Sequence, residues 1–180
     1  MIFERAASAD GSMRLLAPEA VGSSTYKAAY KNGDAVFLSG NLDDAWTQKE
    51  WDRFYGVAKW LVNHDFRVVI NPVAMLADVR ATVQDDKTKV IIWSSHASDD
   101  GVLYDAANKP LPDDILAVLA GKNFKQVIFS ACSGKEVTTR YKTAEHVSEI
   151  YWEGKTTTDD LFAYLYSDRW NPTQFGENKE

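Results

Sequence analysis

VIIWSSHASDDG (residues 90–101) and KQVIFSACSG (residues 125–134) are the two stretches that decide the fold. Each is an apolar run that ends in a cluster of small residues, as a buried strand does where it reaches a loop. The first cluster contains His96, and the second contains Cys132, the only cysteine of the chain. If the two strands are parallel neighbours, their carboxyl ends bring an imidazole and a thiol to the same edge of one sheet.

Strand and helix patterns alternate on either side of these stretches. Continuous apolar runs predict strands, and helical periodicity lies between them: strands at 35–40, 67–73, 89–95 and 125–131, helices within 43–66, 74–85 and 111–123. Continuous rather than alternating apolar strands indicate a parallel sheet with helices on both faces. The predicted fold class is therefore α/β, a three-layer αβα sandwich with a mostly parallel central sheet. Ligands of such sheets bind beyond the carboxyl ends of the strands.

The length of 180 residues and the hydrophobic content of 45% suit one well-buried core. Residues 1–34 show little periodicity and are expected to form an irregular arm or an edge hairpin. The main domain is predicted at 35–170, with 171–180 as a C-terminal tail.

Composition disfavours several classes of function. A net charge of −6 does not suit a nucleic-acid surface, which needs clustered Lys and Arg. The sequence contains no run of about 20 apolar residues that would cross a membrane, and its first residues lack the apolar centre of a signal peptide. One cysteine excludes an internal disulfide and a multi-cysteine metal site. We therefore expect a cytoplasmic protein with no metal and no organic cofactor, since no nucleotide-binding or zinc motif occurs either.

The two reactive residues have an ordinary interpretation as well as a catalytic one. A lone buried cysteine is usually an inert small hydrophobe, and a lone histidine is usually a surface or capping group. Here both residues stand at strand ends with small residues around them. That joint placement favours a His96–Cys132 dyad.

The element order and the segments around His96 and Cys132 resemble those of a known family. The order of elements, the segments SSHASDDG and FSACSG, and the later EIYWEGKTTTDDLFAYL at residues 149–165 resemble the caspase-like (caspase–hemoglobinase) cysteine peptidases. The likeness is closest to the CHAT-domain and metacaspase-type proteases, and it covers roughly residues 35–166.

The resemblance implies a mechanism and a class of partner. Cys132 would attack a peptide carbonyl, His96 would protonate the leaving amine, and the backbone amides of Ala97 and Cys132 would hold the oxyanion. Ala97 stands where the family has glycine. The expected partner is a protein or peptide substrate, and members of this group are commonly switched on by cleavage, an activating partner or an ion.

The resemblance also suggests substrate contacts. Asp43, Asp44 and Ser130 match the pocket for the side chain preceding the cut, and the two carboxylates would suit a basic residue. The alternative is that Asp43 or Asp44 caps the following helix. The predicted strand at 147–154 offers edge pairing to an extended peptide, which makes Trp152 and Glu153 candidate contacts. Core packing is the alternative for Trp152.

Two other functions are considered. SACSG is similar to the nucleophile elbow of an α/β-hydrolase that would use cysteine. In that fold the catalytic histidine comes late in the chain, after the catalytic acid. Here the histidine that follows Cys132 is His146, and it comes before Asp159 and Asp160. The second alternative is a catalytically silent caspase-like protein with a binding or structural role, for which the alanine at position 97 is the motivating observation.

Overall fold

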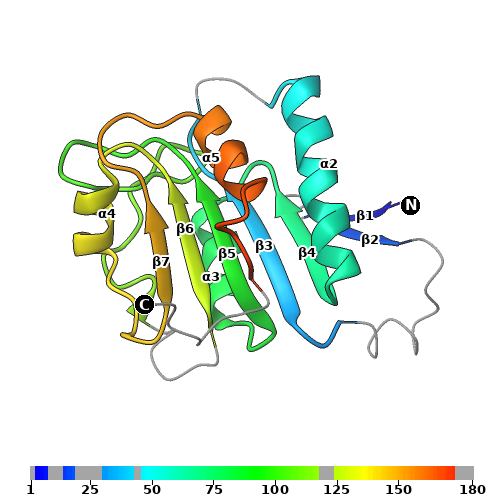
Figure 1. Ribbon diagram of the computed structural model, residues 1–180. Coiled ribbons are helices and arrows are strands. Elements are labelled where there is room, and N and C mark those ends of the chain that lie inside the picture. Colours follow the sequence, from blue (N-terminus) through cyan, green and yellow to red (C-terminus); the bar gives the residue numbers. More distant parts are fainter. Residues whose placement is uncertain (1–2, 8–13, 19–29, 43–45, 118–123, 173–180) are drawn as a thin grey trace.

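The computed structural model describes residues 3–7, 14–18, 30–42, 46–117 and 124–172. Its centre is a seven-stranded sheet with the order β1-β2-β4-β3-β5-β6-β7 (Figure 1). The strands are β1 (Phe3–Ala7), β2 (Arg14–Pro18), β3 (Gly33–Ser39), β4 (Phe66–Asn71), β5 (Thr88–Ser94), β6 (Gln126–Ser130) and β7 (Ser148–Tyr151). The five strands from β4 to β7 in this order are parallel, while β1 and β2 form an antiparallel pair beside β4. The prediction of a mostly parallel sheet is confirmed.

In the described part of the chain, four helices cover the two faces of the sheet: α2 (Gln48–Asn63), α3 (Leu76–Gln84), α4 (Gly134–Arg140) and α5 (Thr158–Leu165). Phe54 of α2 and Phe162 of α5 belong to the apolar cluster on one face. Val79 of α3 and Val137 of α4 belong to the cluster on the other face. In Figure 1, α2 and α5 lie in front of the sheet and α3 lies behind it. These are the three layers that the continuous apolar strands predict.

The order in which the parallel strands are added to the sheet reverses once along the chain. The chain enters at β3, adds β4 on one side, and then returns to add β5, β6 and β7 on the other. Crevices form at such a reversal, beyond the carboxyl ends of the two central strands, which here are β3 and β5. This order is common to doubly wound sheets, so it defines the α/β class rather than a single family.

Two predictions about helices need correction. The N-cap of α2 is Thr47, so the expectation that Asp43 or Asp44 caps this helix is wrong. The helix begins after Thr47 because the Thr47 side chain accepts a hydrogen bond from the Glu50 amide at 3.3 Å. In return, the Glu50 carboxylate accepts one from the Thr47 amide at 2.7 Å. This reciprocal pair is a capping box.

The second correction concerns the helix predicted at 111–123. Residues 111–117 form turns with i to i−3 bonds, such as the Ile115 amide to the Pro112 carbonyl at 3.0 Å, and 118–123 lie outside the described residues. The first residue of the predicted helix, Leu111, has its backbone bonded to other segments. Its amide donates to the Leu103 carbonyl at 2.9 Å, and its carbonyl accepts from the Tyr141 hydroxyl.

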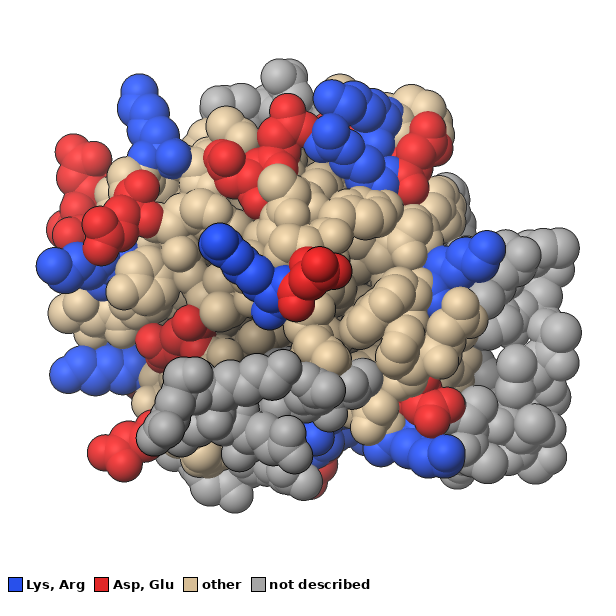
Figure 2. Space-filling model, viewed as in Figure 1, with Lys and Arg blue, Asp and Glu red and all other residues tan. Residues whose placement is uncertain are grey.

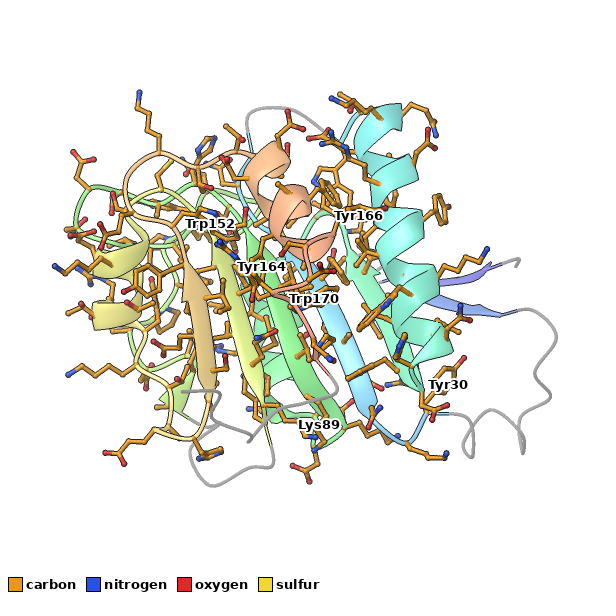
Figure 3. All side chains as sticks on the ribbon, viewed as in Figure 1. Tyr30, Lys89, Trp152, Tyr164, Tyr166 and Trp170 are labelled. Carbon is orange, nitrogen blue, oxygen red and sulfur yellow. The ribbon has the colours of Figure 1, made fainter. Side chains whose placement is uncertain are left out.

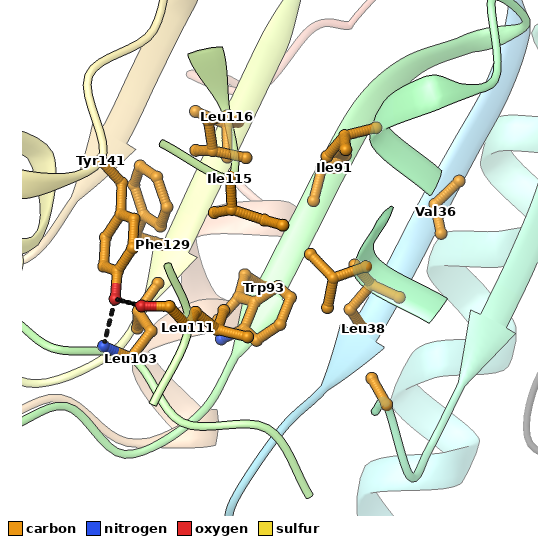
Figure 4. Close-up of a cluster of buried hydrophobic side chains, with 14 of the residues drawn as sticks. Val36, Leu38, Ile91, Trp93, Leu103, Leu111, Ile115, Leu116, Phe129 and Tyr141 are labelled. Atoms are coloured by element: carbon orange, nitrogen blue, oxygen red, sulfur yellow. Dashed lines mark hydrogen bonds between the residues drawn. The ribbon is translucent and has the colours of Figure 1, made fainter. Parts of the chain in front are cut away.

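Tyr141 joins two loops inside the core (Figure 4). Its side chain is 0% exposed, and its hydroxyl accepts from the Leu103 amide at 3.0 Å and donates to the Leu111 carbonyl at 3.2 Å. Burial raises the pKa of this hydroxyl, against a smaller lowering by the bond from Leu103. One side-chain oxygen therefore satisfies the Leu103 amide and the Leu111 carbonyl at the same time.

Replacing Tyr141 with Phe is expected to lower the free energy of unfolding by about 2 kcal/mol, because a buried amide and a buried carbonyl lose their partner. Urea unfolding followed by fluorescence measures it. Tyr166→Phe is the matched control, since the Tyr166 hydroxyl also bonds a carbonyl, that of Arg53 at 2.7 Å, but the residue is 58% exposed. Equal losses for the two variants would contradict the proposed role of the buried hydroxyl.

The surface carries charges of both signs. Figure 2 shows Lys and Arg side chains interspersed with Asp and Glu on the viewed face, with uncharged surface between them. Among the described helices, none is long and apolar enough to span a bilayer.

Candidate active site

The carboxyl ends of β5 and β6 carry His96 and Cys132 to the same edge of the sheet. The strands are parallel neighbours, with Ser94 opposite Ser130. His96 and Cys132 each follow the end of their strand by two residues. The Ser95 amide continues the pairing by donating to the Ser130 carbonyl at 3.2 Å. Since neighbouring strands lie about 4.8 Å apart, the fold brings the carboxyl ends of the two strands side by side, and the prediction that β5 and β6 are neighbours is confirmed.

One cavity of about 310 Å³ is lined by both His96 and Cys132. Leu42, which follows β3, also lines it, so the cavity lies at the reversal between β3 and β5. The hydroxyl residues Ser94, Ser95 and Ser130 contribute the strand-end side. His96 and Cys132 are both partly exposed, and a ligand in the cavity would reach them.

The backbone around His96 is held by the chain that follows β3. The His96 amide donates to the Asn41 carbonyl at 2.7 Å. The neighbouring Ser95 hydroxyl donates to the Tyr104 carbonyl at 2.8 Å. The ring atom Nε2 of His96 is shielded from solvent. These contacts fix the point from which the imidazole projects.

Ala97 does not need the conformational freedom of glycine. Among the described residues, the non-glycine positions with positive φ are Asp65, Asn108 and Ser133, so Ala97 has an ordinary backbone conformation. It pairs with Leu103 in a short antiparallel bridge. The left-handed position of this loop falls at Gly101, with φ of 80°.

Cys132 lies in a tight turn between β6 and α4. The next residue, Ser133, is left-handed, with φ of 54° and ψ of 41°. The Ser133 amide donates to the Gly154 carbonyl at 3.0 Å, and the Gly134 amide donates to the Trp152 carbonyl at 3.1 Å. A Cβ on Gly134 would lie 2.5 Å from that carbonyl oxygen. The turn that presents the thiol therefore rests directly on the segment after β7.

Of the two amides expected to hold an oxyanion, that of Cys132 belongs to a residue lining the cavity, whereas Ala97 is not among its described lining residues and packs against the apolar cluster of α3 and α4. Across residues 30–42, 46–117 and 124–172, neither the Ala97 amide nor the Cys132 amide donates to a backbone carbonyl. Both flank the reactive side chains. A ligand carbonyl in the cavity could therefore reach the Cys132 amide without displacing a backbone acceptor.

A clamp holds the His96 loop against the helix that follows Cys132. Gly101 approaches the α4 backbone so closely that an added Cβ would lie 2.4 Å from the Glu136 carbonyl carbon. Arg140 of α4 pairs with Asp100 at 3.0 Å and with Asp113 at 2.8 Å. The Ser98 hydroxyl bond, helped by Arg140 and opposed by slight desolvation, holds the pKa of Asp100 below its usual value. The clamp thus sets the spacing of the two loops.

The opposite wall of the cavity comes from the N-termini of α2 and α5. Thr47, Glu50 and Thr158 line it, and the Thr158 hydroxyl donates to Oε1 of Glu50. The helices also meet through Arg53 of α2, which pairs with Asp159 of α5. Sequence reasoning missed this wall. The pattern Thr-x-x-Glu at 47–50 does indicate a capping box, but it gives no sign of the contact with Thr158.

The other predicted contacts lie elsewhere. Among the described residues, Trp152 and Glu153 do not line the cavity. Trp152 is half-buried and meets Tyr164 edge-on, with ring centroids 5.9 Å apart, and Figure 3 shows the two side chains next to each other. Glu153 is exposed. Asp43 and Asp44 lie outside the described residues.

No protein-family model and no curated protein matches this sequence. The described part of the chain brings together no group of three or more His, Cys, Asp or Glu side chains able to hold a metal ion. The class that the fold and the cavity define is an α/β protein with a histidine and a cysteine at its switch point.

Acid is expected to weaken the junction of α2 and α5. Partial burial raises the pKa of Glu50, but hydrogen bonds from Thr158 and Thr47 have the larger combined effect, so the pKa is lowered overall. Hydrogen bonds from Thr157 likewise lower the pKa of Asp160. A lowered carboxyl pKa stabilises the fold at higher pH, and this contribution is lost as the pH falls below about 4. The drop in urea midpoint from pH 6 to pH 3 should be smaller in Glu50→Gln; an equal drop would contradict this account.

Proposed function

We propose that this protein is a caspase-like cysteine endopeptidase that uses a His96–Cys132 dyad. The single observation that carries the proposal is that both residues line one cavity at the strand reversal of a parallel sheet. A histidine beside a cysteine can activate the thiol and later act as an acid. The amides of Ala97 and Cys132 supply the remaining component, a place for the oxyanion.

The chemistry follows from these positions. The Cys132 sulfur attacks the peptide carbonyl carbon, and its proton passes to His96. The tetrahedral intermediate collapses when His96 gives that proton to the leaving amine, which leaves an acyl group on the sulfur. Water, deprotonated by His96, then releases the acid and restores the thiol. Each oxyanion donor is worth about 3 kcal/mol in enzymes of this type of chemistry.

The proposal extends to partner and setting. The substrate is a protein or peptide, whose extended backbone can pair with β7, the strand at the end of the sheet. The thiol must stay reduced to react, so a cytoplasmic setting belongs to the same proposal.

A peptidyl acyloxymethyl ketone tests the dyad. We expect one adduct on the intact protein by mass spectrometry, and no adduct on Cys132→Ala or His96→Ala. Denaturation followed by iodoacetamide shows that the thiol of His96→Ala is intact, so that its lost labelling reports on chemistry. Folded wild-type protein that takes up no probe would contradict the proposal and favour a silent binding protein.

A further inference from the structure

A carboxylate stands in the wall of the cavity, across from the reactive pair. Glu50, in the first turn of α2, lines the same cavity as His96 and Cys132. No Lys or Arg is among the described residues that line it. Among the described lining residues, Glu50 is the one ionisable group outside the proposed dyad. It therefore gives this wall a negative charge that a bound side chain meets.

The charge of Glu50 is retained at neutral pH. Its Oε2 accepts from the Thr47 amide at 2.7 Å and from the Thr47 hydroxyl at 2.9 Å. Its Oε1 accepts from the Thr158 hydroxyl. Although partial burial raises the pKa of Glu50, these bonds lower it overall. All the donors are neutral groups, so they hold the carboxylate without cancelling its charge.

The basic side chains near Glu50 pair with a different carboxylate. Arg53 and Lys49 both pair with Asp159, the latter at 3.9 Å. Within the described part of the chain, Glu50 forms no ion pair of its own. A carboxylate offers about four acceptor positions, and three are used by Thr47 and Thr158. One position on Oε1 is left for a ligand.

The rest of the cavity suits one long side chain. Its volume of about 310 Å³ is at the small end of ligand sites. Leu42 and Trp46 supply apolar surface, which a methylene stem can cover while its charged head reaches a polar group. A lysine or arginine has this form.

We propose that Glu50 selects a basic side chain, Lys or Arg, next to the peptide bond that is cleaved. The inference rests on the proposed peptidase function and names its substrate class. Glu50 acts as a specificity-determining residue: it binds the cation while Cys132 and His96 act on the neighbouring bond. Glu50, on α2, provides the negative charge for a basic substrate side chain that the sequence analysis assigned to Asp43 and Asp44.

The test compares two peptides that differ only in charge, one with arginine and one with neutral, isosteric citrulline before the reporter group. Wild-type protein is expected to prefer arginine in kcat/KM, and Glu50→Gln to lower the arginine-to-citrulline ratio at least tenfold. Glutamine also completes a capping box, so the variant should fold. The matched control is Asp160→Asn: Asp160 caps α5 in the same way, accepting from the Thr157 amide at 2.8 Å, but does not line the cavity. Its ratio should equal that of wild type.

A binding measurement separates this inference from the proposed function. Calorimetry on Cys132→Ala, with arginine and citrulline peptide amides, needs no turnover. Stronger binding of the arginine peptide that Glu50→Gln removes, without hydrolysis by wild-type protein, would support Glu50 and overturn the peptidase. Hydrolysis of both peptides at one rate would support the peptidase and overturn Glu50. An unchanged ratio in Glu50→Gln would overturn the role of Glu50 as well.

Discussion

Peptide hydrolysis is expected to fall at least a thousandfold when Cys132 is replaced by Ala, and by a similar factor in His96→Ala. In the proposed mechanism the sulfur forms the bond to substrate, while the imidazole moves the proton in both half-reactions. Residues that act as a unit give non-additive losses. The double variant should therefore be no slower than Cys132→Ala alone. Initial rates on a fluorogenic peptide measure all three variants.

The control for the histidine is His146→Ala. His146 is exposed and does not line the cavity, so hydrolysis by this variant should match wild type. Circular dichroism checks that each variant is folded. Retention of more than a tenth of the rate in Cys132→Ala would exclude Cys132 as the nucleophile. A loss in His146→Ala equal to that in His96→Ala would mean that the assay does not report on the cavity.

Gly101→Ala is expected to have the largest effect on stability, lowering the free energy of unfolding by about 3 kcal/mol. A φ of 80° is unfavourable for alanine. The new Cβ would also lie 2.6 Å from the Val137 amide nitrogen, part of a rigid helix. Relief requires the loop to move away from α4, which shifts His96 relative to Cys132. Hydrolysis should then fall about a hundredfold even under folded conditions.

Gly154→Ala isolates the steric part of this effect. Gly154 has a φ of 78°, almost the same as that of Gly101, but no atom lies within 4 Å of the position of its Cβ. Its replacement should cost only the backbone strain, about 1 kcal/mol. Urea unfolding of both variants gives the two values. If Gly154→Ala is as destabilising as Gly101→Ala, the contact with α4 contributes nothing and the proposed clamp is wrong.

The sheet was predictable because its strands are buried on both faces. β3, β5 and β6 are almost entirely buried, and such strands must be continuous apolar runs. α4 was not predicted. Its sequence, GKEVTTR, has a glycine and three β-branched residues in seven positions, and these are weak helix formers. Tertiary contacts hold it instead, through buried Val137 and the Gly134 amide bond to Trp152.

The candidate site was predictable in part for a similar reason. Each of His96 and Cys132 follows a strand that the sequence reveals, and parallel topology alone places both at one edge. Glu50 and Thr158 could not be paired from the sequence. They are 108 positions apart, and their contact depends on how α2 and α5 lie across the sheet. Helix packing of this kind leaves no local pattern.

The origin of the cavity wall has a consequence for folding. The residues that surround the cavity come from four distant parts of the chain, and the last to be synthesised are Thr156, Thr157 and Thr158. Long-range contacts of this kind form late, after slower loop closure. A nascent chain that has exposed β6, and with it the thiol, still lacks this side of the pocket. In the proposed peptidase, the complete substrate pocket therefore forms only after synthesis has passed α5.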